Sequence, residues 1–320
     1  MSEFNVDFPM MVNMMATLLL LMAVGYISRR AGFTDDRSSK WLSNFVICVC
    51  QPFMIINAVI SIEFSFDNLK MAGIVMAVGI AVHAVSAVVA HLSTIRYKNI
   101  DERAIVEYGV IFGNCGFMGF PVIKAMLGDT ALFWAAFYVI DFNIICWTYG
   151  MIVLSRARKE IKINVKNMFL NYGTTPCLIG LVLWLSRLSL PQPLLSTIKY
   201  MGDVCTPLSM IIVGSLLATI PVKKLLADLK VYYACAARII INPLVVILIG
   251  KLIGLEHIHP LGRSLMIFIT VMASVPVASN SAMFAERYDL LPAKTAQIVG
   301  LSTVISALTI PVMIWIESLI

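Results

Sequence analysis

The stretch GNCGFMGFPVIK, residues 113–124, interrupts an apolar segment that is long enough to cross a lipid bilayer. Pro121 has no N–H group and blocks the preceding helical turn, while Gly113, Gly116 and Gly119 permit unusual dihedral angles and close backbone approach. Broken backbone at membrane depth is tolerated only where it is buried in protein or lines a polar cavity, because unsatisfied N–H and C=O groups cost several kcal/mol in lipid. The stretch therefore predicts a helix break inside the protein.

A second interruption of this kind lies in SVPVASNS, residues 274–281, where Pro276 breaks another apolar segment. Two interrupted segments at corresponding positions of two halves are the best pointer in a sequence to a midplane binding site of a secondary transporter. Each segment alone could be an ordinary proline kink, which transmembrane helices tolerate. The pair, each member of which carries an asparagine, favours a binding site.

The polar residues at the two breaks indicate what such a site would bind. If the breaks cross near the midplane, two half-helix N-termini direct partial positive charge into one cavity, which suits an anion. Asn114 and Asn280 supply amide donors, and Ser279 and Ser281 supply hydroxyls, without the cost of a buried charge. The predicted ligand is a small anion.

The composition shows in what medium these breaks lie. Hydrophobic residues make up 60% of the 320 residues and charged residues 13%, with a mean hydropathy of +0.89. These values lie outside the range of soluble domains and indicate a polytopic membrane protein. Runs of about 20 apolar residues can cross a hydrocarbon core about 30 Å thick. The runs and the breakers between them predict ten spans, at 8–29, 38–60, 68–95, 104–127, 130–154, 168–187, 195–219, 229–254, 262–288 and 294–318.

The distribution of basic residues predicts the orientation. Most of the 24 lysines and arginines, among them Arg29, Arg96 and Arg156, fall in loops on one side of a ten-span arrangement. By the positive-inside rule this side faces the cytoplasm, so both termini are expected on the non-cytoplasmic side of the cell membrane. The same distribution accounts for the net charge of +6 without a nucleic-acid partner.

The longest polar connector divides the chain into two halves. RARKEIKINVKN, residues 156–167, follows the fifth expected span, so residues 1–155 and 168–320 hold five spans each. Because five is an odd number, the halves enter the membrane from opposite sides, which is the arrangement behind alternating access. The predicted fold class is all-α integral membrane, with ten transmembrane helices as a 5+5 inverted repeat and broken, crossing helices 4 and 9.

Ionisable residues inside the expected spans are functional candidates, because a charge in the membrane is costly. Glu107 lies about two helical turns before Asn114 and could take up a proton coupled to transport; alternatively it is an interfacial acid paired with Arg103. Asp141 lies near the middle of the fifth expected span and is the better candidate for a coupling residue. Arg238 is expected to extend its charge to the membrane surface, although it could also pair with an acid or attract substrate.

Other classes of chemistry find little support. His83 and His91 share a helical face, but they lack a nearby third ligand for a metal site. The chain contains no HExxH, GxSxG or P-loop motif. The 7 cysteines lie mostly in apolar segments and give no disulfide framework. We therefore expect no enzyme, no metal and no cofactor.

The motifs resemble those of the auxin efflux carrier superfamily over nearly the whole chain. GNCGFMGFPVIKAMLGD resembles its fourth-span signature, and Asn114, Met118, Gly119, Pro121 and Lys124 match that signature. Further matches, in order along the chain, are GYISRRAGF at 25–33, MGDVCTPLSMIIVGSLLA at 201–218, RIIINPLVVILIGKLIGL at 238–255 and the segment at 274–312. The short connector makes a compact, bacterial-type member the closer match.

The resemblance implies a fold and a site. It implies a homodimeric, elevator-type carrier in which spans 1, 2, 6 and 7 form a scaffold and spans 3–5 and 8–10 form a transport domain. Lys124, which matches the family's lysine, is expected to support the site rather than bind substrate, whereas Glu107 and Asp141 are coupling candidates because of their position inside the spans and not because of the resemblance. The implied substrate-binding residues are Asn114, Cys115, Gly116, Pro121, Pro276, Val277, Ser279, Asn280 and Ser281.

The leading functional hypothesis is a secondary transporter of a small organic anion, such as a dicarboxylate or an auxin-like weak acid. Both proton coupling through Glu107 or Asp141 and uniport are consistent with the sequence. Its expected partners are the substrate, membrane lipid and a second copy of the chain. One alternative is a cation-coupled symporter or antiporter with Asp141 as an ion ligand. Another is a membrane sensor that binds a ligand without transporting it, which the absence of a soluble output domain disfavours.

Overall fold

The structure is a computed structural model that describes residues 8–161, 166, 169–219 and 228–320. In this part of the chain the secondary structure is helical apart from one isolated β-bridge, so the all-α prediction is confirmed. The expected connector is described only in part, because residues 162–165 and 167 lie outside these ranges, as does residue 168 at the start of the expected second half.

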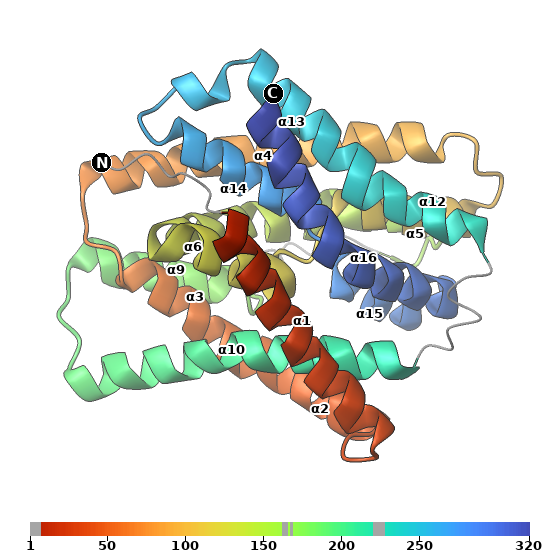
Figure 1. The fold of residues 1–320 in the computed structure, drawn as a ribbon, viewed down its shortest axis with the longest axis horizontal. Helices are drawn as coiled ribbons and strands as arrows, with labels where there is room; N and C mark the ends of the chain where they lie inside the picture. Colours follow the sequence, from red (N-terminus) through yellow and green to blue (C-terminus); the bar gives the residue numbers. More distant parts are fainter. Residues whose placement is uncertain (1–7, 162–165, 167–168, 220–227) are drawn as a thin grey trace.

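The helices follow the expected segments closely (Figure 1). Here η1–η4 are single π-helical turns and η5 is a 3-10 turn. The bounds are α1 Phe8–Arg30, α2 Asp36–Phe45, η1 Val46–Cys50, α3 Gln51–Ile60, α4 Phe66–Thr94, α5 Ile100–Ile111, η2 Cys115–Gly119, α6 Phe120–Ile145, η3 Cys146–Gly150, α7 Met151–Ser155, α9 Thr174–Ser186, α10 Gln192–Thr219, α12 Leu229–Ala236, η4 Ala237–Ile241, α13 Asn242–Leu252, η5 Leu255–His257, α14 Gly262–Ser274, α15 Ser279–Arg287 and α16 Pro292–Leu319.

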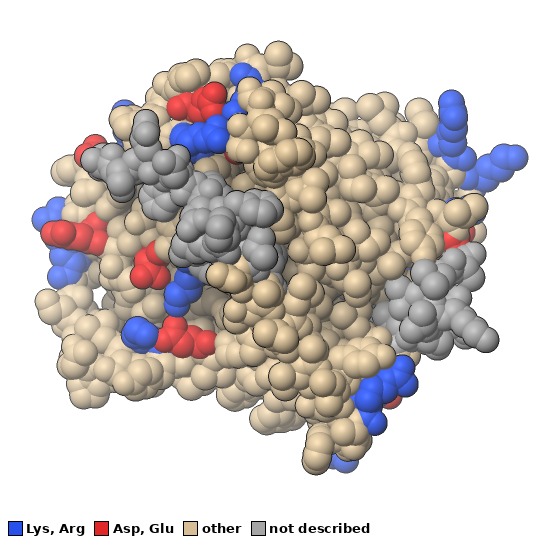
Figure 2. All heavy atoms as spheres, in the orientation of Figure 1, with Lys and Arg blue, Asp and Glu red and all other residues tan. Residues whose placement is uncertain are grey.

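By length and composition, 6 helical stretches of the described chain can cross a membrane. Helix lies within each of the ten expected ranges, but the number of segments that cross stays a prediction. Most charged side chains lie toward the edges of the face shown in Figure 2, and uncharged side chains cover its middle. The qualifying stretches are Asp36–Ile60, Phe66–Thr94, Met126–Ser155, Gln192–Thr219, Leu229–Leu252 and Pro292–Leu319, and the shorter apolar helices are Thr174–Ser186 and Gly262–Ser274.

Side-chain caps fix where several helices begin. Asp35 precedes α2 and accepts a hydrogen bond from the Ser38 amide, while the Ser38 hydroxyl bonds back to the Asp35 amide. Ser65 caps α4 in a similar way, and Asn99 accepts bonds from two amides in the first turn of α5. Each such bond satisfies an N–H group that the helix cannot pair internally. The residues before these helices therefore set their starting points.

The helices form two groups with a buried layer between them. Figure 1 shows α1, α2, α3 and α10 along one side and α4, α12 and α13 along the other, with α6 and α14 between. α1 and α10 approach closely, because a Cβ at Gly25 would collide with the backbone of Ile211 and one at Gly214 with the backbone of Met22. The half-helices α5 and α14 are the most enclosed elements, since every residue from Ala104 to Ile111 is buried, as is almost all of α14.

Candidate functional site

The two predicted breaks lie against each other at the centre of the molecule. α5 ends at Ile111 and α14 ends at Ser274, and the extended segments that follow them pair antiparallel through a bridge between Gly113 and Val277. The Asn114 amide donates to the Pro276 carbonyl at 2.7 Å, and the Ala278 amide donates to the Phe112 carbonyl at 3.0 Å. Each break thus supplies hydrogen-bond partners to the other where water is excluded.

The first break lies earlier in the chain than Pro121, where the sequence predicted it. The non-helical residues are 112–114, whereas Pro121 lies in the first turn of α6, after the π-helical turn η2. A proline is tolerated in the first turn of a helix because the N–H that it lacks would be unpaired there. Pro121 therefore begins a helix and does not form the break.

Arg238 holds together the C-terminal ends of α5 and α14 at the crossing. It is buried, and its guanidinium donates to the Val110 and Val275 carbonyls at 2.9 Å each, with longer bonds to Ile111 at 3.4 Å and Met272 at 3.3 Å. These acceptors belong to the C-terminal ends of α5 and α14, where a helix leaves carbonyls unpaired and carries partial negative charge. The expectation that Arg238 extends to the membrane surface is wrong, because the two helix ends provide the acceptors that its donors need.

Gly113 is required by the same arrangement. A Cβ at this position would overlap the Arg238 guanidinium and come within 2.6 Å of a Val275 side-chain carbon. Only a residue without a side chain allows the crossing strands and the arginine to pack together. The glycines of the break thus leave room for neighbouring side chains and also allow unusual backbone angles.

A cavity of about 370 Å³ lies at the crossing, where η2 and α15 begin. Polar residues from α2, α3 and α6 complete its wall, namely Asn44, Gln51 and Asn143. Half-helix N-termini at such a cavity provide the partial positive charge that the sequence predicts. Five of the predicted binding residues line it: Asn114, Cys115, Gly116, Ser279 and Asn280.

The predicted polar residues also contact one another across the crossing. The Asn114 side-chain amide donates to the Ser279 hydroxyl at 3.1 Å, which joins the two halves of the chain. The Asn280 amide contacts the Cys146 sulfur at 3.5 Å, and its side-chain carbonyl oxygen is buried without a hydrogen-bond partner among the described residues. Gly116 leaves room for Gln51, whose amide nitrogen lies 3.0 Å from where a Cβ would be. Amide groups from three parts of the chain therefore meet at the cavity.

The remaining predicted binding residues lie outside the cavity wall. Pro276 and Val277 form the crossing strand through their backbone bonds. Ser281 is buried, and its hydroxyl has no hydrogen-bond partner in the described part of the chain. Pro121 lies in α6, as described above. These residues support the wall rather than form it.

Arg287 is a cavity residue that the sequence reasoning missed. It is the one charged side chain among the described residues that line the cavity, and it lies on α15 with Asn280 and Met283. Positions 280, 283 and 287 are spaced three and four apart and so share one helical face. That spacing from Asn280 was the signal in the sequence that could have identified Arg287.

The three predicted coupling or supporting residues lie apart from the cavity. Glu107 is fully buried, with a carboxylate oxygen 2.8 Å from Arg156 and another 3.7 Å from Arg103. The alternative in which Glu107 pairs with Arg103 is thus present in the structure, strengthened by Arg156. Lys124 forms an ion pair with Asp203 of α10 at 3.0 Å. Glu107 and Lys124 therefore form ion pairs that join different helices or their ends.

Asp141 differs from Glu107 because it is buried without a charged partner in the described part of the chain. Its side chain packs against Gly79 of α4, and its Oδ2 atom has no hydrogen-bond partner among the described residues. Nearby His83 is also buried, and its Nδ1 atom lies 2.7 Å from the Gly79 carbonyl oxygen. An unpartnered carboxylate in a membrane interior is unfavourable in its charged form.

Comparison with known proteins shows the family to which this chain belongs. The chain belongs to the membrane transport protein family, whose model matches residues 10–314. This match confirms the resemblance to the auxin efflux carriers, and the chain is an integral membrane protein with a transport role.

The similar proteins carry names that agree with this family. An uncharacterized transporter of Methanocaldococcus jannaschii is 23% identical over 95% of this chain and 98% of its own length. An uncharacterized transporter of Methanothermobacter thermautotrophicus is 24% identical over 92% of this chain and 94% of its own length. A protein of Rhizobium meliloti named "Putative malonate transporter" is 19% identical, with 92% of each chain covered.

Proposed function

We propose that the chain is a secondary transporter of a small organic anion, bound in the cavity at the crossing of the two broken helices. The observation that carries this proposal is the cavity wall itself. It combines the Asn114–Ser279 pair, the beginnings of η2 and α15, and the cationic side chain of Arg287. Donors and positive charge, with no carboxylate among the described lining residues, suit a carboxylate or dicarboxylate. The name of the rhizobial relative makes malonate the first substrate to test.

We further propose the ten-span, 5+5 inverted-repeat architecture, with residues 1–155 and 168–320 as its halves. The two breaks at matching places and their antiparallel pairing support this arrangement. The contacts also support a scaffold of α1, α2, α3, α9 and α10, since α1 packs on α10 and α3 packs on α9 and α10. α4, α5, α6 and α12–α16 pack mainly on one another and would form the transport domain.

In this proposal the transport domain carries the cavity past the scaffold, and the chain works as a homodimer with both termini on the non-cytoplasmic side. Proton coupling through Asp141 is the form of coupling that we favour, because a buried carboxyl with no charged partner among the described residues is the acid best suited to gain and lose a proton. Asp141→Asn should then abolish the dependence of uptake on an imposed proton gradient while leaving binding intact.

Uptake of labelled malonate into proteoliposomes tests the proposed function. We expect wild-type protein to accumulate the label and Asn114→Ala to lose at least about 90% of this activity, since a lost hydrogen bond to a charged group costs about 1.5–3 kcal/mol. Asn57→Ala, which makes the same substitution in α3 away from the cavity, serves as the control. Undiminished uptake by folded Asn114→Ala would overturn the assignment of the binding site to this cavity. Binding of carboxylates without transport of any of them would favour the alternative of a membrane sensor.

A further inference from the structure

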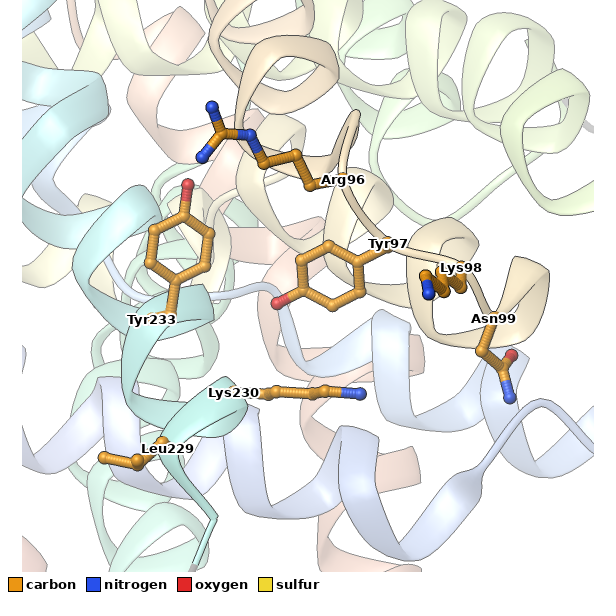
Figure 3. Close-up of a pocket in the computed structure, with 7 residues that line it drawn as sticks. All are labelled: Arg96, Tyr97, Lys98, Asn99, Leu229, Lys230 and Tyr233. Carbon is orange, nitrogen blue, oxygen red and sulfur yellow. The ribbon is translucent and has the colours of Figure 1, made fainter.

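A second pocket, of about 510 Å³, lies at the end of the molecule that the basic residues predict to be cytoplasmic (Figure 3). It lies between the loop that joins α4 to α5 and the beginning of α12, well separated in sequence from the cavity at the crossing. None of its residues lines that cavity. The lining residues are Arg96, Tyr97, Lys98, Asn99, Leu229, Lys230 and Tyr233.

The acids near this pocket are already paired. Glu102 contacts Lys230 and Lys294, and Asp228 contacts Lys294 at 2.9 Å. Arg96 and Lys98 are exposed and have no ion-pair or hydrogen-bond partner among the described residues. These two residues therefore leave the pocket with positive charge that a bound anion would neutralise.

The side chains enclose the pocket from both sides. Figure 3 shows Arg96, from the α4–α5 loop, and Tyr233, from α12, pointing toward one another across it, with the Tyr97 ring beside them. The Lys230 ammonium lies 5.8 Å from the centre of the Tyr97 ring. In Figure 2, basic side chains project from the edge where the α4–α5 loop lies in Figure 1. A headgroup would thus meet cations and tyrosines together, as at membrane interfaces.

Exposed apolar side chains from two elements lie at the pocket. The α4 stripe consists of Val88 and Leu92 of α4 and of Ile95 directly after it, which are 59%, 63% and 58% exposed and lie on one side of the helix. On α12 the exposed residues Leu229 and Tyr233 lie one turn apart and themselves line the pocket, and α4 contacts η4 and α13, which continue α12. Hydrocarbon chains can follow such stripes into the bilayer, whereas a free anion would gain nothing from them.

We propose that this pocket binds the headgroup of an anionic phospholipid, with Arg96 and Lys98 at the phosphate and the acyl chains along the α4 and α12 stripes. Basic pockets between membrane helices on the cytoplasmic side are suited to such headgroups. The lipid would join the α4–α5 loop to α12, two parts of the proposed transport domain. This inference does not depend on which substrate occupies the other cavity.

Titration of the purified chain in neutral detergent with dioctanoyl phosphatidylglycerol, followed by thermal unfolding, tests this site. We expect the lipid to raise Tm of the wild type, and the apparent Kd to rise about 30-fold in the double variant Arg96→Gln/Lys98→Gln. A change in Kd of this size corresponds to about 2 kcal/mol of binding free energy, at about 1.4 kcal/mol for each tenfold change. The control Arg37→Gln/Lys40→Gln, which removes the same charge from an exposed part of α2, should bind like the wild type.

The same titration with two other compounds separates the sources of the effect. Dioctanoyl phosphatidylcholine and inorganic phosphate should not raise Tm over the same concentrations. Leu229→Asp, at a residue that is 85% exposed, should weaken phosphatidylglycerol binding without harming the fold. Equal effects of the two lipids, an equal effect of inorganic phosphate, or unchanged affinity in the Arg96/Lys98 variant would each overturn the proposal.

Discussion

Arg238 is the residue on which the crossing depends most. Its guanidinium takes the place of water for four carbonyls at the ends of two buried helices. The sequence revealed the charge but not its partners, because α5 and α14 are more than twenty residues away and an arginine in a span can reach the membrane surface, pair with an acid or attract substrate. Asn114, by contrast, was predictable, since its place beside a glycine-rich break is a local property.

Removing the Arg238 charge should destabilise the chain strongly. We expect Arg238→Met to lower stability by about 3 kcal/mol or more, because a side chain of similar length leaves buried carbonyls without donors. Thermal unfolding in detergent measures the effect, and Arg37→Met on exposed α2 is the control. A Tm within a degree of the wild type would contradict the role given to Arg238.

Glu256 provides a pH-dependent contribution outside the membrane-crossing helices. A hydrogen bond from Lys251, aided by Arg263, holds the pKa of Glu256 below its usual value of 4.5. A carboxyl with a lowered pKa in the folded state stabilises above its unfolded pKa and loses this contribution as the pH falls through the folded value. Glu256→Gln should therefore lower Tm at pH 7, and the difference from wild type should shrink below about pH 4.5. Exposed Glu63→Gln should show no such convergence.

At the scale of elements, the sequence predicted which segments are helical better than where they bend. Hydropathy and breakers located the helices, and the interruption of α6 at Gly128 falls between two expected spans. The first break was expected around Pro121 but lies at 112–114, because glycine and a distant arginine determine it rather than the proline. The π-helical turns within the long helices leave no comparable trace in hydropathy, since they depend on i→i+5 bonding.

The ion pair between Lys124 of α6 and Asp203 of α10 joins the proposed transport domain to the scaffold. Movement of one group past the other must break it, so Lys124→Gln should change the uptake rate up to about fivefold without changing substrate affinity, as expected for a partly exposed pair worth about 1 kcal/mol or less. Lys199→Gln removes the other partner of Asp203, which lies within α10, and should leave the rate unchanged. Equal effects of both variants would contradict a role in domain movement.

At the scale of the whole molecule, membrane insertion, an all-helical fold and membership of a transporter family were accessible from composition and motifs. The cavity was only partly accessible: five predicted residues line it, but the contributions of α2, α3 and Arg287 depend on packing between distant segments. The two-domain organisation remains a proposal that the contacts between helices support. The homodimer and the elevator motion remain proposals that follow from the resemblance to the auxin efflux carriers.

The cysteines offer a direct test of whether substrate occupies the cavity. Cys48 of η1 is exposed and lines the cavity, whereas the other cysteines are buried. Its alkylation therefore reports on the space between η1 and the crossing, without any engineered label.

The decisive measurement is the rate of maleimide labelling of Cys48 in purified protein as malonate and other dicarboxylates are added, with dimethyl malonate as the uncharged control. Our account predicts that a transported dicarboxylate slows labelling of the wild type at least about tenfold at saturation, that the diester does not, and that Asn114→Ala loses this protection. Unchanged labelling of Cys48 at saturating concentrations of a substrate that the protein transports would contradict the account.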